Sequence, residues 1–130
     1  MIRKALVIWL NAHKTVCICV DQQRHDILQY ILNDDSILKE FSLIKNLLFE
    51  NQRNRERYCK VDVSKKAHDI YEMRFINNGR NDRIYCKEIR STARFIIIAD
   101  LFIGKKSQNI PKQIIPRIEN IGGNNYEIIK

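Results

Sequence analysis

The residues best suited to do chemistry in this sequence are cationic and lie in its second half. Four of them stand out: Arg74, Arg83, Lys105 and Lys106. Arginine stays protonated at physiological pH, so Arg74 and Arg83 are suited to holding a phosphate and stabilising negative charge. A lysine amine can lose its proton near neutral pH when like charges lie beside it, so Lys105 or Lys106 is suited to proton transfer. This set favours chemistry on a phosphate ester.

The charge balance supports an anionic partner. The 130 residues hold 23 Lys and Arg against 15 Asp and Glu, which gives a net charge of +8 and a pI near 9.5. Residues 70–130 contribute eleven basic and six acidic side chains, so the excess is C-terminal. A polyanion or an acidic protein is therefore the expected partner.

Neither a metal site nor export is expected. The four cysteines include no C-x-x-C pair, and the three histidines keep no zinc-ligand spacing with them: Cys17, Cys19, Cys59, Cys86, His13, His25 and His68. The apolar run at 5–10 is too short for a signal peptide, and no stretch approaches the ~20 apolar residues that span a bilayer. We therefore expect reduced thiols, no cofactor, no membrane association and a cytoplasmic location.

The pattern along the chain predicts one domain, residues 1–130, of the α+β class. Residues 15–20 are β-branched and indicate a strand, and 5–10 is a second candidate. Helical spacing follows at 21–32, where Asp21 is available as N-cap, and again at 37–48 after a turn and second cap at residues 33–36. Residues 51–69 are expected to be a helix end and connector, in which Arg53, Arg55 and Arg57 form a solvated surface.

The second half predicts an antiparallel meander. Residues 70–75 alternate with period two, 77–82 supply turn residues, and 83–89 and 94–103 complete three strands. A short C-terminal helix begins at Pro111 or restarts at Pro116, and Gly122-Gly123 ends it. We therefore expect an N-terminal strand and two helices packed on an antiparallel sheet, with the short helix at the C-terminus.

Four motifs in this order resemble the RelE/ParE superfamily of toxin-antitoxin proteins, in particular its HigB-like, phage-derived branch. They are Ile70-Tyr71-Glu72-Met73-Arg74-Phe75, then Arg83-Ile84-Tyr85, then Asp100-Leu101-Phe102, then Gly104-Lys105-Lys106 with Pro111-Lys112. The resemblance covers residues 68–116 and implies a RelE-like fold. It also implies the toxin of a type II system, a cytoplasmic endoribonuclease that cuts mRNA at the ribosome and is silenced by a cognate antitoxin.

Metal-free RNA cleavage needs a proton acceptor, a proton donor and cations around the phosphate. With the resemblance, Arg74 and Arg83 become charge stabilisers, and Lys105 or Lys106 becomes the acid or base. Lys87, Arg90 and Arg94 are expected to extend the electropositive surface, and Tyr85 to stack on a base. We expect Arg83→Ala, and Lys105→Ala or Lys106→Ala, to abolish growth arrest and mRNA cleavage with the fold intact.

The sequence also departs from the family pattern. Asp82 and Asp100 stand where an aromatic residue and a histidine are common, and Pro116 interrupts the last helix. Tyr126 is the candidate for the family's C-terminal Tyr or His. Two alternatives therefore stay open: a ParE-like gyrase inhibitor without nuclease activity, and an inactive relative that binds nucleic acid or antitoxin.

Overall fold

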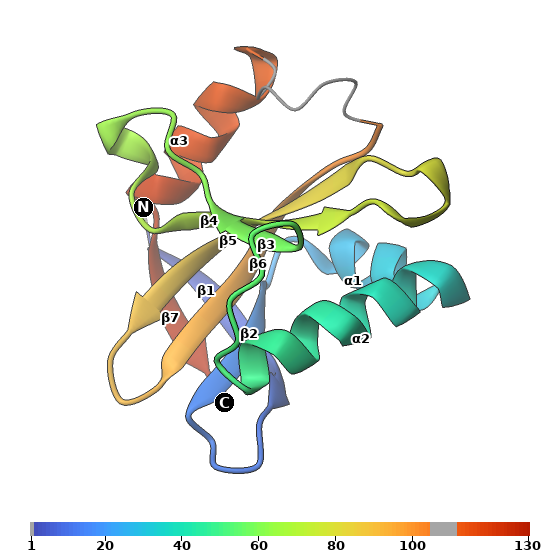
Figure 1. Ribbon diagram of the computed structural model, residues 1–130. Helices are drawn as coiled ribbons and strands as arrows, with labels where there is room; N and C mark the ends of the chain where they lie inside the picture. Colours follow the sequence, from blue (N-terminus) through green and yellow to red (C-terminus); the bar gives the residue numbers. More distant parts are fainter. Residues whose placement is uncertain (1, 105–111) are drawn as a thin grey trace.

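The structure, a computed structural model, describes residues 2–104 and 112–130. Its centre is a mixed seven-stranded sheet in the order β3-β4-β5-β6-β2-β1-β7. The strands are β1 (Ile2–Leu10), β2 (Val16–Asp21), β3 (Tyr58–Lys60), β4 (Ile70–Phe75), β5 (Asp82–Arg90), β6 (Arg94–Phe102) and β7 (Asn125–Ile129). Figure 1 shows α1 (His25–Leu32) and α2 (Asp35–Phe49) on one face and α3 (Ile115–Gly123) on the other. The expected α+β class is confirmed.

The sequence led us to expect an antiparallel sheet, but the sheet is mixed. The meander β4-β5-β6 is antiparallel, but β6 pairs in parallel with β2 and β1 pairs in parallel with β7. Parallel neighbours need long connections, so they depend on the path of the whole chain and leave no local sequence signal. The strands β3 and β7 were not predicted either, because each is short and lies at an edge of the sheet, paired with a single neighbour.

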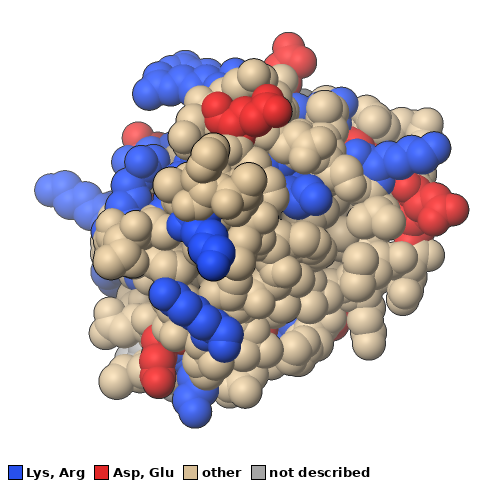
Figure 2. Space-filling model, turned by 90° about the horizontal axis from the view of Figure 1, so that it is seen from below, with Lys and Arg blue, Asp and Glu red and all other residues tan. Residues whose placement is uncertain are grey.

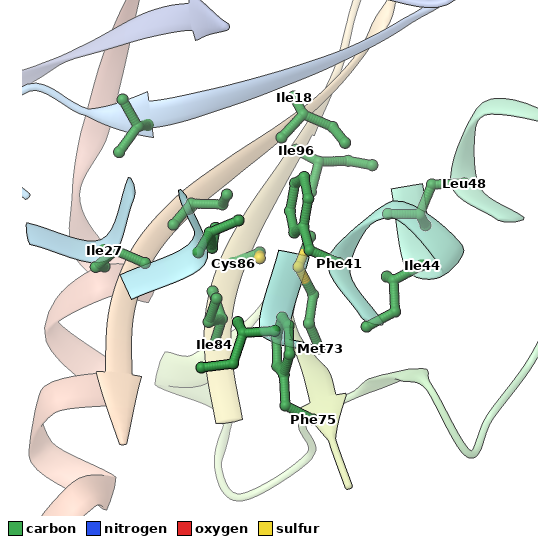
Figure 3. Packing of buried hydrophobic residues seen from close by; sticks show 14 of the residues in the cluster. Ile18, Ile27, Phe41, Ile44, Leu48, Met73, Phe75, Ile84, Cys86 and Ile96 are labelled. Atoms are coloured by element: carbon green, nitrogen blue, oxygen red, sulfur yellow. The ribbon is translucent and has the colours of Figure 1, made fainter. Parts of the chain in front are cut away.

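The main core lies between the sheet and the helices α1 and α2. Helix α2 places Phe41, Ile44 and Leu48 on one stripe against Met73 and the neighbouring strands (Figure 3). Asp34 caps this helix by accepting hydrogen bonds from the N–H groups of residues 36 and 37, as predicted.

Local signals at the other turns are mostly confirmed. Asn78 and Gly79 both have positive φ, 59° and 73°, in the turn between β4 and β5. Pro116 lies in the first turn of α3, where its missing N–H costs nothing, so the helix restarts there. Asp21 is not the N-cap, because β2 ends at Asp21 and the helix begins only at His25; its carboxylate accepts two hydrogen bonds from Arg3.

A smaller core lies on the opposite face, beneath α3. Its members come from β4 to β6, α3, the turn at Lys65–Ala67 and the residues just after β3 and just before α3: Val61, Ala67, Ile70, Tyr85, Ala99, Ile114, Ile118 and Ile121. This core includes Tyr85, which lies on the same face of the sheet as Arg74 and Arg83. In the described part of the chain, no helix is long and apolar enough to cross a membrane.

Candidate functional site

Arg74 and Arg83 are brought together on the α3 face of the sheet. They are directly opposite in the β4–β5 pairing, and in an antiparallel pair such residues point to the same side. Between them lies Glu72, whose Oε1 is 3.2 Å from Nη2 of Arg74 and whose Oε2 is 3.3 Å from Nε of Arg83. The expected pair of guanidinium groups therefore exists, and a carboxylate that the sequence analysis gave no role joins them. We call Glu72, Arg74, Arg83 and Tyr85 the arginine cluster.

The arginine cluster is mostly buried. Arg83 is 0% exposed and Glu72 is 3% exposed, while the side chain of Arg74 keeps 25% of its surface. Burial lowers the pKa of Arg83, and the nearby Glu72 carboxylate opposes this shift. Arg83→Ala is therefore not a neutral substitution for the fold, and the expectation that it would be is corrected.

Several polar atoms of the cluster lack hydrogen-bond partners among the residues that the structure describes. They are Nε and Nη2 of Arg83, Oε2 of Glu72 and the hydroxyl of Tyr85. Nη1 of Arg83 donates to the carbonyl of Asp82 at 3.1 Å. Burial raises the pKa of Tyr85, so its hydroxyl keeps its proton at neutral pH. The cluster thus holds donors that an anionic oxygen can engage.

Lys105 and Lys106 lie outside the described residues. The residue before them, Gly104, donates its backbone N–H to Asp82 at 2.8 Å, beside Arg83 on β5. The chain therefore leaves β6 at the end of the sheet where the arginine cluster lies.

Contrary to expectation, Lys87 does not extend the electropositive surface and Tyr85 is not placed to stack on a base. Lys87 is 7% exposed, and its amine donates to the carbonyl oxygens of Gly122 and Asn124 at 2.9 and 2.6 Å, where α3 ends. Tyr85 is 0% exposed and packs in the core beneath α3, so its ring is not available for stacking on a base. Both side chains hold α3 against the sheet.

Arg90 and Arg94 lie on the other face of the sheet, with α1 and α2. Arg94 donates to both oxygens of Glu88 at 2.8 and 2.7 Å, while the side chain of Arg90 is 70% exposed. They line a cleft of about 540 Å³ between the C-terminal end of α2, the connector that follows it and the strands β3 to β6. We call it the basic cleft.

The basic cleft also contains three cations that the sequence analysis assigned to solvent or passed over: Arg53, Arg55 and Lys60. The sequence suggested a fraying helix end, on which alternate arginines diverge. Instead α2 ends at Phe49 and Asn51 takes a positive φ of 55°, so the connector turns back across the sheet. Arg57 points elsewhere and pairs with the buried carboxylate of Glu40 at 2.6 Å.

Two tyrosines form an aromatic wall of the basic cleft. The rings of Tyr58 and Tyr71 stack with centroids 5.2 Å apart and planes 3° from parallel. The guanidinium carbon of Arg94 lies 6.0 Å from the Tyr58 ring centroid. The Tyr58 hydroxyl donates to Glu88, so the same carboxylate fixes both Arg94 and the tyrosine pair.

The positions that depart from the family pattern make structural contacts. Asp100 accepts hydrogen bonds from Arg24 and Arg117, each at 2.8 Å, and Tyr126 donates to Asp21 at 2.8 Å. Burial alone would raise the pKa of Asp100, but the bonds from Arg117 and Arg24 outweigh it and lower the pKa. These groups line a small cavity of about 240 Å³ beside α3.

Comparison with known proteins adds no relative. No family model, curated protein or solved structure matches the chain. Within the described residues, no group of three or more His, Cys, Asp and Glu side chains is placed to hold a metal ion.

Proposed function

We propose that this chain is a metal-independent endoribonuclease that cuts mRNA, the toxin of a toxin-antitoxin pair, as its resemblance to the RelE/ParE superfamily suggests. The observation that supports the proposal most is the pairing of Arg74 with Arg83 at the end of the sheet from which Lys105 and Lys106 continue. Two guanidinium groups at adjacent positions suit the doubly charged phosphorus centre of RNA cleavage.

The reaction would proceed by attack of the ribose 2′-oxygen on the neighbouring phosphorus. The 2′-hydroxyl proton passes to a base, the bond from phosphorus to the 5′-oxygen breaks, and that oxygen takes a proton from an acid. Arg74, the cluster's partly exposed member, would meet the phosphate first, and Arg83 would stabilise the added charge behind it. Lys105 or Lys106 would serve as base or acid, and Glu72 offers a second proton acceptor.

A second candidate, an RNA-binding relative without nuclease activity, is favoured by a specific observation. Arg83 and Tyr85 are completely buried, and Tyr85 packs beneath α3 and the turn at Lys65–Ala67, so RNA reaches these two side chains only when the structure around them shifts. The basic cleft needs no such shift.

Mapping of transcript ends by primer extension after induction separates these candidates. New ends in the wild type, lost in Arg74→Ala and retained in Lys39→Ala, would support the nuclease, because Arg74 is in the cluster and Lys39 is an exposed cation of α2. Intact transcripts with retained RNA binding would support the second candidate instead. Growth arrest with intact transcripts would point to the gyrase-directed alternative, which a supercoiling assay would then test.

A further inference from the structure

The basic cleft carries positive charge that the protein itself does not neutralise. Arg53, Arg55 and Lys60 are exposed, and none of them forms an ion pair with any residue in 2–104 or 112–130. Asp62 is the one carboxylate among the described lining residues. Figure 2 shows the molecule from below, where Lys and Arg side chains outnumber Asp and Glu side chains. Such an excess attracts an anionic ligand.

The cleft also offers groups that recognise more than charge. Asn51, Gln52 and Asn54 line it with amides, which can both donate and accept hydrogen bonds. Tyr71 stacks on Tyr58 and is half-buried, so the aromatic pair presents part of its surface to the cleft. Its volume of about 540 Å³ lies within the range of ligand-binding clefts.

We propose that the basic cleft binds a segment of single-stranded RNA. Arg53, Arg55 and Lys60 contact the phosphates, and a base stacks on the tyrosine pair formed by Tyr58 and Tyr71. Cations beside stacked aromatic rings are the usual means by which proteins hold single strands, because the rings require an unpaired base and the cations follow the backbone. An acidic peptide would use the cations but would gain little from the rings.

The choice of RNA as ligand rests on the proposed function, but the site is separate from the arginine cluster. The lining side chains Tyr58, Tyr71 and Arg94 lie on the face of the sheet that carries α1 and α2, whereas Arg74 and Arg83 lie on the α3 face. The basic cleft therefore acts as an anchoring site whose loss weakens RNA binding without altering the groups proposed for cleavage.

The first test measures binding of a fluorescently labelled, 12-nucleotide single-stranded RNA by anisotropy. We expect the triple variant R53A/R55A/K60A to bind at least tenfold more weakly than the wild type. The matched control K4A/K39A/K130A removes three exposed cations elsewhere and should stay within about threefold, since general attraction is weak without local contacts. Equal losses in the two variants, or no loss in the first, would overturn the proposal.

The second test separates base stacking from charge. Tyr71→Phe keeps an aromatic ring and should bind like the wild type, whereas Tyr71→Leu should bind about fivefold or more weakly, as loss of one base-aromatic stack predicts. Circular dichroism and thermal unfolding confirm that both variants fold. Equal binding by the two variants, stronger binding of duplex RNA than of the single strand, or displacement of RNA by an equally charged polyglutamate peptide would contradict the proposal.

These measurements also distinguish the two proposals. Wild-type protein that binds RNA through the cleft and leaves transcripts intact would remove the nuclease and retain the anchoring site. If the wild-type protein cuts transcripts and R53A/R55A/K60A binds and cuts RNA as well as the wild type does, the nuclease is retained and the anchoring site is removed.

Discussion

Arg83 and Glu72 form an ion pair that the fold removes almost entirely from water. Loss of one partner costs about 3–5 kcal/mol when the other is left as an uncompensated buried charge. In Arg83→Met the Glu72 carboxylate keeps Arg74 at 3.2 Å, so we expect the free energy of unfolding, measured by urea denaturation, to fall by an amount at or below the lower end of that range. The double variant E72Q/R83M should recover part of the loss, because it removes both charges.

The control for this prediction is Arg74→Met. The side chain of Arg74 is a quarter exposed and is paired with the same carboxylate, Glu72. Because water can compensate for the loss of this arginine, we expect the substitution to lower the free energy of unfolding by less than about 1 kcal/mol. A similar cost for Arg74→Met and Arg83→Met would mean that burial does not set the importance of the two arginines.

Asp100 should make the protein acid-sensitive. Its pKa is lowered in the folded state, because the hydrogen bonds from Arg117 and Arg24 outweigh the opposing effect of burial. A lowered carboxyl pKa contributes stability that is present above the unfolded value of about 4 and is lost as the pH falls through the folded value. We expect the free energy of unfolding of Asp100→Asn to fall less between pH 5 and pH 2 than that of the wild type. Parallel pH profiles would refute this assignment.

At the residue scale, the sequence predicts the site only in part. The period-two pattern of residues 70–75 and the turn after it predict the hairpin, and the register that places Arg74 opposite Arg83 comes from the structure. The burial of Lys87 and Tyr85 is not encoded in that pattern. Both side chains are buried because α3, which is distant in the sequence, packs against β5.

The packing of α3 over Tyr85, a member of the arginine cluster, depends on one close backbone approach. A Cβ added at Gly122 in α3 would lie 2.0 Å from the carbonyl oxygen of Lys66, whereas one at Gly123 would meet nothing within 4 Å. We therefore expect Gly122→Ala to destabilise the protein by about 1–3 kcal/mol, because α3 must move away from the turn at Lys65–Ala67. Gly123→Ala should have little effect or stabilise the helix slightly.

Thermal unfolding of the two alanine variants measures this contrast. A second readout follows from the arrangement of α3 over Tyr85: displacement of the helix in Gly122→Ala should raise the fluorescence quenching of tyrosine by iodide, and Gly123→Ala should not. Equal melting temperatures would show that the contact between α3 and Lys66 is dispensable.

At the element scale, the signals that succeed are the local ones. The stripe along residues 37–48, the Asp34 cap and the restart at Pro116 are confirmed, since each depends on residues within one or two turns. The parallel pairing of β2 with β6 and of β1 with β7 was not predicted, because those partners are far apart in the sequence. The basic cleft was missed for a related reason: Arg53 and Arg55 converge only because the connector leaves the helix.

At the scale of the whole molecule, the two faces of the sheet carry different parts of the proposed activity, with the arginine cluster on one and the basic cleft on the other. Binding through exposed cations releases counterions, so the logarithm of the affinity for single strands falls with the logarithm of salt concentration by about 0.7 per neutralised phosphate. If Arg53, Arg55 and Lys60 each neutralise one phosphate, the slope of R53A/R55A/K60A should be shallower than that of the wild type by about 2.

The matched variant K4A/K39A/K130A keeps the cleft and lowers the net charge by the same amount. Its slope should therefore equal the wild-type slope, although its affinity falls slightly through weaker long-range attraction. Anisotropy titrations from 50 to 300 mM salt measure both slopes. Equal slopes for the two triple variants would mean that net charge, rather than the basic cleft, holds the RNA. The face of the sheet that carries α1 and α2 would then have no RNA-anchoring function of its own.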